Sequence, residues 1–340
     1  MKVFKSILKY TFTLIIAFGL LWYVFRDIDL GTLFEKVKKA DFTFVYISIA
    51  LSLISHFLRG YRWTLLLKPL NYKVNSFRAF IAVMVGYFAN LLLPRMGEIT
   101  RCAILKKTDN IAIPASLGTV ISERIIDLLL LLLLIFSTII IEFKTLKNFL
   151  SDYVNSIIEG FNLGNYLVLG GVLLLVILIG IYLFRRYNES IRSSNFYKKL
   201  NPMVYDLISG LKSIRNIKEK TAFFVSTALI WILYYLMSYI IVFSFPETSN
   251  LDFFAGLSIL MAGGLGMAAP VQGGIGTYHA FVGGVIMLYG ISKEDGVLFA
   301  TLLHTSQFVS IVVFGGISFI ISLFLHKNPN GNEPENIAAQ

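Results

Sequence analysis

The stretch GGLGMAAPVQGGIG, residues 263–276, decides how this chain folds, because it interrupts an apolar run that would otherwise be predicted as one long helix. It holds six glycines and one proline in 14 positions, within an apolar segment that covers residues 251–290. Glycine and proline weaken a helix by roughly 1 and 3 kcal/mol relative to alanine. In a lipid bilayer, a freed backbone group has no water to bind. The stretch therefore predicts two half-helices that turn back on each other at a site inside the protein.

Composition places the chain in a membrane. Of its 340 residues, 56% are hydrophobic and 15% are charged, whereas a typical soluble domain has about 25% charged residues. Several segments hold the roughly 20 mainly apolar residues that a membrane-spanning helix needs. The apolar residues run consecutively and do not alternate as they do in a membrane β-barrel. We therefore expect an all-α polytopic membrane protein without a soluble catalytic domain.

Basic residues are unevenly distributed between the loops. Residues 59–78 hold five basic and no acidic residues, and residues 185–220 hold nine basic and three acidic residues. Lys2, Lys5 and Lys9 precede the first apolar segment. The positive-inside rule places these three tracts in the cytoplasm. Both termini are therefore expected on the cytoplasmic side of the cytoplasmic (inner) membrane, which the chain crosses several times.

Eight or so hydrophobic segments follow from this pattern. About six are predicted to cross the membrane fully: residues 9–25, 42–58, 116–141, 165–184, 221–245 and 297–325. Two others, residues 77–107 and 251–290, have helix breakers near their middle and are predicted to be re-entrant hairpins. Span, hairpin and span then occur twice with opposite orientation, and such inverted repeats are common in transporters. The alternative is that either segment crosses the membrane fully twice.

The first hairpin carries charged residues at its break. In PRMGEITR, Pro94 ends one half-helix, and Gly97 and Glu98 begin the next. Arg95, Glu98 and Arg101 recur every three residues and so share roughly one helix face. Two guanidinium groups beside one carboxylate suit a phosphate, which arginine binds through charge-assisted hydrogen bonds. An ion-pair network that clamps the hairpin accounts for the same residues equally well.

The next span also begins with charged residues. In SERIIDLL, Glu123 and Asp127 are four residues apart and share a face, and Arg124 lies between them in the chain. A charge inside a bilayer costs about 2.5–3.5 kcal/mol and usually faces a partner or a water-filled cavity. We expect a polar cavity here. The alternative to a polar cavity is that these charged residues lie at the membrane surface, where the helix starts.

Arg59 and Arg62 lie three residues apart in LRGYRW, directly after the second predicted span. Together with Trp63 they are expected to anchor this span at the membrane interface, because basic residues flank spans on the cytoplasmic side and tryptophan is enriched at the headgroup level. Capture of an anionic lipid headgroup is the alternative use of the two arginines.

Polar residues surround the glycines of the second hairpin: Gln272, Thr277, Tyr278 and His279. The break itself is assigned to four residues: Pro270, Gly273, Gly274 and Gly276. Free N–H groups at half-helix ends can hold an anion, so Gln272 and His279 are candidate headgroup ligands. His279 could also carry a proton, although a hydrogen-bonded core histidine is the more common case. His304 and Gln307 form a further polar patch, for which hydrogen bonding between helices is the expected role.

Signatures of soluble catalysis and of cofactor binding are missing from the sequence. There is no G-x-x-x-x-G-K-[ST] loop and no G-x-S-x-G motif. The four histidines lack metal-ligand spacing, and there is one cysteine. We therefore expect no cofactor, no metal and no nucleic-acid partner. The sequence still allows one alternative, a membrane-embedded acid/base site made of Glu98, Glu123 and Asp127.

Four motifs occur in a characteristic order: RGYRW, PRMGEITR, SERIID and PVQGGIG. In this order and at these places they resemble the transmembrane region of lysylphosphatidylglycerol synthases, a region also found alone in flippase-like membrane proteins. The resemblance covers roughly residues 10–325. The residues at the family's motif positions are Arg95, Gly97, Glu98, Arg101, Glu123, Arg124, Asp127, Pro270, Gly273, Gly274 and Gly276. Many members have an acidic residue about three positions after the last glycine, where this chain has His279.

The resemblance implies a function in lipid movement. In bifunctional members this region is thought to flip an aminoacylated phospholipid that a separate soluble domain makes. This chain is expected to be a stand-alone membrane part, with residues 1–326 as the flippase-like domain and residues 327–340 as a disordered cytoplasmic tail. We expect it to bind a phospholipid or lipid-linked headgroup and to translocate it across the membrane. A membrane-embedded lipid-modifying transferase and an accessory subunit in envelope assembly stay as alternatives.

Overall fold

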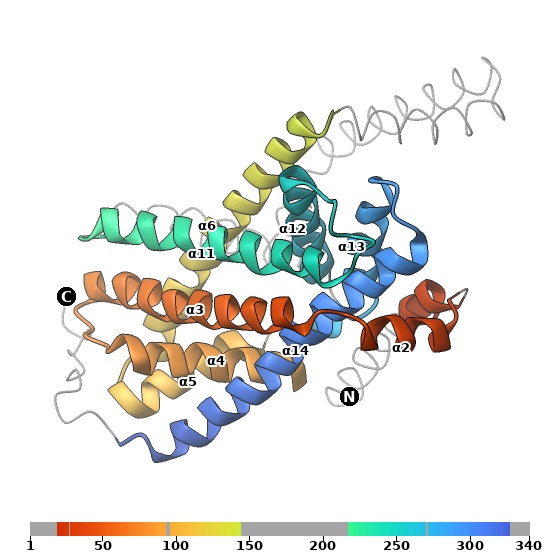
Figure 1. Ribbon diagram of the computed structural model, residues 1–340. Helices are drawn as coiled ribbons and strands as arrows, with labels where there is room; N and C mark the ends of the chain where they lie inside the picture. The colour runs from red at the N-terminus through yellow and green to blue at the C-terminus, as the bar shows by residue number, and fades with distance from the viewer. Residues whose placement is uncertain (1–18, 27, 93–95, 144–216, 270, 327–340) are drawn as a thin grey trace, which may run out of the picture.

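The computed structural model describes residues 19–26, 28–92, 96–143, 217–269 and 271–326, and every regular element within these ranges is a helix (Figure 1). The main helices are α2 (Leu30–Lys38), α3 (Phe42–Leu67), α4 (Ser76–Leu92), α5 (Met96–Asp109), α6 (Ile113–Ile141), α11 (Lys220–Tyr239), α12 (Phe253–Ala268), α13 (Thr277–Met287) and α14 (Lys293–Phe324). Several predictions lie outside the described residues, namely span 165–184, most of span 9–25, tail 327–340, Pro94, Arg95 and Pro270.

Four of the described helical segments are long and apolar enough to cross a bilayer. They are Phe42–Leu70, Ile113–Ile141, Lys220–Ser244 and Lys293–Phe324. Each coincides with one of the six predicted spans, and the other two predicted spans fall wholly or mostly outside the described residues. The prediction of an all-helical chain with membrane-length apolar helices is therefore confirmed for this part of the protein.

Helix α3 extends further than predicted. It begins after Asp41, whose carboxylate accepts a hydrogen bond from the N–H of Thr43 at 2.9 Å. The sequence-based span ended at residue 58, but the helix continues to Leu67. It continues because the charged residues of its last turns find partners inside the protein and do not need to reach water.

Each predicted hairpin segment forms two short helices that pack against each other. Helices α4 and α5 have 17 and 14 residues, and helices α12 and α13 have 16 and 11 residues. At 1.5 Å per residue these helices are about 17–26 Å long, below the roughly 30 Å of the bilayer hydrocarbon. Each of the four is therefore shorter than a full span.

Glycine permits the tight second break, a 3-10 turn at residues 272–274 labelled η4. Three glycines there have left-handed backbone, with φ of +60°, +71° and +81°: Gly273, Gly274 and Gly276. Residues with a side chain rarely adopt this conformation. Close packing needs Gly266 as well, because a methyl group there would lie 2.7 Å from the Cα of Tyr278. The hydroxyl of Thr277 donates to the carbonyl of Gly266 at 2.8 Å and ties α13 to α12.

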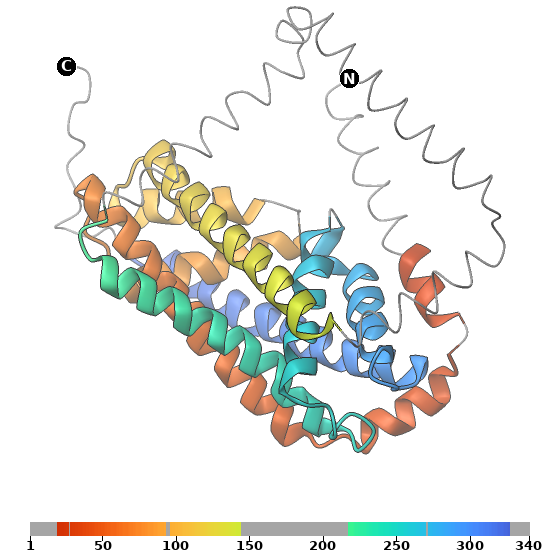
Figure 2. The ribbon, with the colours of Figure 1, turned by 90° about the horizontal axis from the view of Figure 1, so that it is seen from above.

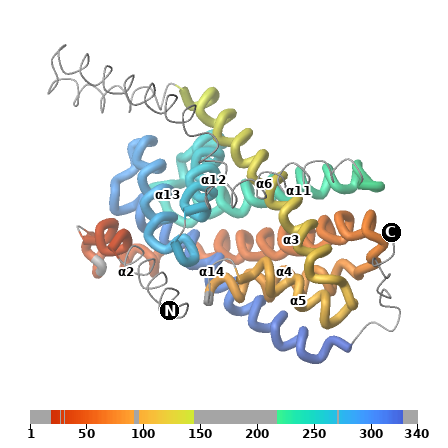
Figure 3. The backbone as a smooth tube through the Cα atoms, turned by 180° about the vertical axis from the view of Figure 1, so that it is seen from behind, coloured from red at the N-terminus to blue at the C-terminus, as the bar shows by residue number. Residues whose placement is uncertain are grey.

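The two halves of the chain interleave. Helix α3 of the first half packs along α11 of the second, and Figure 2 shows the two side by side. Helix α4 packs against α14, and helix α12 packs against α6 (Figure 3). Each helix pair thus contacts the last helix of the opposite half.

Candidate functional site

A group of charged side chains lies where α3, α5 and α6 meet. Arg59 of α3 donates to Glu123 of α6 at 2.8 Å and to Asp127 of α6 at 3.1 Å. Arg62 binds both carboxylate oxygens of Asp127, at 2.8 and 3.0 Å, and reaches Glu123 at 3.1 Å. Arg101 of α5 donates to the second oxygen of Glu123 at 3.0 Å. We call these five residues the charge cluster.

The charge cluster is buried and has an excess of positive charge. Glu123 and Arg62 are fully buried, and Arg59 is 5% exposed. Three guanidinium groups face two carboxylates, which leaves one positive charge in excess. Burying a charge is costly unless a partner compensates it. The cluster is therefore suited to the binding of an anion.

Helix α11 holds the two arginines of α3 in place. The Nη1 of Arg59 donates to the hydroxyl of Tyr234 at 2.9 Å, and the Nη1 of Arg62 donates to the hydroxyl of Thr227 at 3.4 Å. Bonds to two further helices leave each guanidinium little freedom to change rotamer. The arrangement therefore joins both halves of the chain at the charge cluster.

The sequence predicts that Arg59, Arg62 and Trp63 anchor α3 at the membrane interface. The structure buries all three side chains in protein, where they contact other helices. Trp63 donates to the hydroxyl of Thr119 at 2.9 Å, and the guanidinium of Arg101 lies 4.7 Å from the Trp63 ring centroid. The physical reason is that α6 presents two carboxylates in register with the two arginines, so ion pairing replaces hydration.

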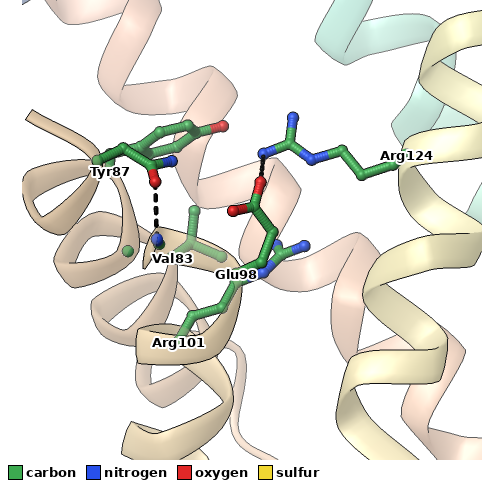
Figure 4. Close-up of a pocket in the computed structure, with 8 residues that line it drawn as sticks. Val83, Tyr87, Glu98, Arg101 and Arg124 are labelled. Atoms are coloured by element: carbon green, nitrogen blue, oxygen red, sulfur yellow. Dashed lines mark hydrogen bonds and ion pairs between the residues drawn. The ribbon is translucent and has the colours of Figure 1, made fainter. Parts of the chain in front are cut away.

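A pocket of about 220 Å³, measured with its open mouth, adjoins the charge cluster (Figure 4). Residues of α4, α5 and α6 line it: Val83, Gly86, Tyr87, Asn90, Gly97, Glu98, Arg101 and Arg124. Arg124 reaches from α6 to donate to Glu98 of α5 at 2.8 Å, as the dashed line in Figure 4 marks. Most of this volume is open to the surroundings, and the enclosed part is about 10 Å³, room for about one water molecule. A larger ligand group would therefore enter from the open side of the pocket.

Several polar atoms at this pocket have unused hydrogen-bonding capacity. The Nε and Nη2 of Arg101 and the Oε2 of Glu98 are buried and have no hydrogen bond to any residue that the structure describes. Buried polar groups in proteins are nearly always hydrogen-bonded. The free edge of the Arg101 guanidinium is therefore a suitable donor pair for the oxygens of a ligand.

The breaks of the two helix pairs contact each other. The side-chain amide of Gln272, in the second break, donates to the carbonyl of Leu91 near the end of α4 at 2.8 Å. A helix leaves its last four carbonyls without an internal partner, so Gln272 caps α4 from the opposite half. His279 is buried beside His304, with 5.1 Å between the ring centroids.

The structure brings together five of the predicted ligand residues: Glu98, Arg101, Glu123, Arg124 and Asp127. Gln272 and His279 lie at the second break instead. Sequence reasoning missed the aromatic residues Tyr87 and Tyr234, for which no local pattern gives a signal. Within the described ranges, no three His, Cys, Asp or Glu side chains converge as a metal ion would require.

Comparison with known proteins agrees with the motif pattern. Residues 10–315 match the family described as the lysylphosphatidylglycerol synthase TM region. A UPF0104 membrane protein of Methanocaldococcus jannaschii is 28% identical over 64% of this chain and 63% of its own length, so the match spans less than two thirds of that relative. A second one from this organism is 27% identical over 69% of this chain and 94% of its own length.

A UPF0104 membrane protein of Methanothermobacter thermautotrophicus is 24% identical over 85% of this chain and 86% of its own length. No solved structure matches the chain significantly. The family match covers most of the chain and confirms the resemblance that the four motifs predict. This membrane protein therefore belongs to the family of the lysylphosphatidylglycerol synthase transmembrane region.

Proposed function

We propose that this protein binds the phosphate-bearing headgroup of a phospholipid, or of another lipid-linked compound, in the pocket and moves it across the cytoplasmic membrane. The observation that carries the proposal is the unpaired, buried edge of the Arg101 guanidinium beside a cluster with one positive charge in excess. Phosphate oxygens accept two parallel hydrogen bonds from a guanidinium. The headgroup would enter from the open side of the pocket, and the acyl chains would stay in lipid.

Glu98 and Arg124 would respond to the incoming headgroup. Their side chains are 25% and 44% exposed, and an exposed ion pair contributes only about 0–1 kcal/mol. A phosphate can therefore displace Glu98 from Arg124 at small cost. The released carboxylate is then available to a cationic or hydroxyl part of the same headgroup.

Movement between leaflets needs a route, and in our proposal the two helix pairs form it. We infer that the pair α4–α5 enters from the cytoplasm, that the pair α12–α13 enters from outside, and that both termini are cytoplasmic. The short helices and the hydrogen bond from Gln272 to Leu91 support this topology, because the bond joins the two breaks. Broken helices that meet near the midplane are where many transporters bind their substrates.

Single cysteines at residues 107 and 293 test the topology. The native Cys102 is buried and is first replaced by alanine to give a cysteine-free background. Re-entrant pairs leave residue 107 inside and residue 293 outside, so a membrane-impermeant maleimide should label Lys293→Cys but not Lys107→Cys in intact cells. Labelling of Lys107→Cys before permeabilisation, or of Lys293→Cys only afterwards, contradicts the inverted arrangement.

Arg101→Gln tests the binding site. The substitution removes the free guanidinium edge, and hydrogen bonds to charged groups contribute about 1.5–3 kcal/mol. We therefore expect the affinity for phosphatidylglycerol to fall by roughly tenfold to a hundredfold. Exchange of a fluorescent phosphatidylglycerol bound to the purified protein measures the change, and Arg101→Lys should restore part of the affinity because it keeps the charge.

Lys106→Gln is the matched control, since Lys106 is exposed on the same helix α5 and lies outside the pocket lining. It removes an equal charge and should leave binding close to that of the wild type. Equal retention of the labelled lipid by Arg101→Gln and Lys106→Gln would remove Arg101 from the proposed site.

A further inference from the structure

Two kinds of polar group in the pocket lack a partner, and they need opposite things from a ligand. The Nε and Nη2 of Arg101 are hydrogen-bond donors, whereas the Oε2 of Glu98 is an acceptor. All three atoms are buried and have no hydrogen bond to any residue that the structure describes. Both side chains line the pocket. A ligand that satisfies the whole site must therefore accept hydrogen bonds and also donate one.

Glu98 and Arg101 lie on the same face of α5. They are three residues apart, a spacing that makes two side chains neighbours on a helix, and Figure 4 shows both extending from α5 toward α6. Each is paired with a different residue of α6, Glu98 with Arg124 at 2.8 Å and Arg101 with Glu123 at 3.0 Å. The remaining donors of Arg101 and the remaining acceptor of Glu98 are therefore left for a group that enters the pocket between them.

The shape of the pocket limits the size of that group. The enclosed part has room for about one water molecule, so a phosphate group is too large to enter it. Arg124, whose side chain is 44% exposed, lies toward the open part. The phosphate of a headgroup would therefore stay in the open part, beside Arg124 and within reach of Arg101. Only a group of one heavy atom would fill the enclosed part.

Among the polar groups of lipid headgroups, a hydroxyl matches this enclosed part best. An ionised phosphate oxygen accepts hydrogen bonds but donates none, so it would leave Glu98 without a partner and oppose its charge. An ammonium donates but cannot accept, and it would add positive charge beside a charge cluster that already has one in excess. A hydroxyl donates one hydrogen bond, accepts others and adds no charge. It can therefore satisfy Glu98 and Arg101 together.

We propose that the pocket selects lipids whose headgroup carries a free hydroxyl beyond the phosphate, and that Glu98 determines this specificity. This inference rests on the proposed function. The hydroxyl accepts a hydrogen bond from the free edge of Arg101 and donates one to the Oε2 of Glu98, while the phosphate stays in the open part of the pocket. Headgroups built on glycerol, inositol or a sugar have such a hydroxyl. Ethanolamine and choline headgroups, which end in a cation, do not.

The selectivity arises from the cost of leaving Arg101 and Glu98 unsatisfied. A site that hydrogen-bonds a hydroxyl strongly rejects an analogue without it, because the buried polar groups of the site are then unpaired. Phosphatidylpropanol is the matched analogue of phosphatidylglycerol, since it has the same charge and nearly the same size but no headgroup hydroxyl. Because both residues are charged, we expect phosphatidylglycerol to bind about tenfold more tightly or better.

Competition against a fluorescent phosphatidylglycerol bound to the purified full chain measures the preference between the two lipids. Glu98→Leu should lose most of the preference, because leucine has a similar size but accepts no hydrogen bond. The ratio of the two affinities is the readout, since a general loss of structure weakens both lipids alike. Glu219→Leu is the matched control and should keep the wild-type ratio, because Glu219 also pairs with one basic residue, Lys68 at 2.6 Å, but lies outside the pocket lining.

The outcomes separate this inference from the proposed function. Equal binding of the two lipids by the wild type, tighter binding of phosphatidylethanolamine than of phosphatidylglycerol, or an undiminished preference in Glu98→Leu overturns the inference and leaves the lipid function intact. If the fluorescent lipid does not bind at all, the lipid function fails. In that case, thermal stabilisation of the wild type by glycerol phosphate but not by propyl phosphate still supports the hydroxyl site, whereas stabilisation by both or by neither overturns it too.

Discussion

Glu123→Gln is expected to leave little folded protein. Glu123 is fully buried and accepts hydrogen bonds from Arg59, Arg62 and Arg101. Glutamine keeps the shape of the side chain but removes one of the two carboxylates that offset three buried guanidinium groups. Removing one partner of a buried ion pair costs about 3–5 kcal/mol, a large part of the roughly 5–15 kcal/mol that stabilises a typical protein. Thermal unfolding in detergent, followed by size-exclusion chromatography, measures the loss.

Glu98→Gln is the matched control, because it makes the same chemical change at a neighbouring ion pair. The side chains of Glu98 and Arg124 are partly exposed, and such pairs contribute about 0–1 kcal/mol. Its unfolding midpoint should therefore stay close to that of the wild type. Similar losses in Glu98→Gln and Glu123→Gln would contradict a special role of the buried carboxylate in holding α3, α5 and α6 together.

The positions of the helices could be predicted closely from the sequence. The spans predicted at residues 116–141 and 297–325 are found as Ile113–Ile141 and Lys293–Phe324. Hydropathy is informative here because a bilayer demands long apolar runs. The glycine-rich stretch 263–276 predicts the second break for an equally local reason, since its left-handed backbone favours glycine.

The partners of the charged residues could not be predicted in the same way. An arginine after an apolar run gives the same local pattern whether water or a carboxylate on another helix neutralises it. The local pattern therefore predicts an interfacial position for Arg59 and Arg62, whereas in the structure they pair with Glu123 and Asp127 of another helix. The bond from Gln272 leaves no trace in the sequence either, because its acceptor is a backbone carbonyl.

The position of the pocket suggests why stability and binding share residues. Arg101 donates to Glu123 with one nitrogen and has two further nitrogens without a partner among the described residues. The same side chain thus fastens α5 to α6 and faces the pocket. A ligand anion would complete its hydrogen bonding, so occupancy of the pocket should raise the stability of the fold. Arg101 lies at the contact between α4 and α5, because a methyl group at Gly86 of α4 would meet its Cβ at 3.3 Å, so this contact should matter for binding as well.

Gly97→Ala is expected to force α4 and α5 apart and to destroy the pocket. A methyl group at Gly97 would overlap the carbonyl oxygen of Gly86 and the side chain of Asn90. The N–H of Gly97 also donates to Asn90 at 2.7 Å, so the clash strains this bond. Overpacking typically costs 1–3 kcal/mol, and a backbone obstacle that cannot rotate aside places this case at about 3 kcal/mol. Because all three residues line the pocket, binding of fluorescent phosphatidylglycerol should fall together with the unfolding midpoint.

Gly118→Ala separates this contact from a general effect of glycine in helices. Gly118 lies within α6, and an added methyl group would meet no atom within 4 Å. Alanine is favoured over glycine in a helix by up to about 1 kcal/mol, so this variant should unfold at or above the wild-type midpoint and bind lipid normally. The difference between the two variants therefore reports the contact between α4 and α5. If Gly97→Ala kept both wild-type stability and lipid binding, the pocket could not depend on the close approach of these two helices.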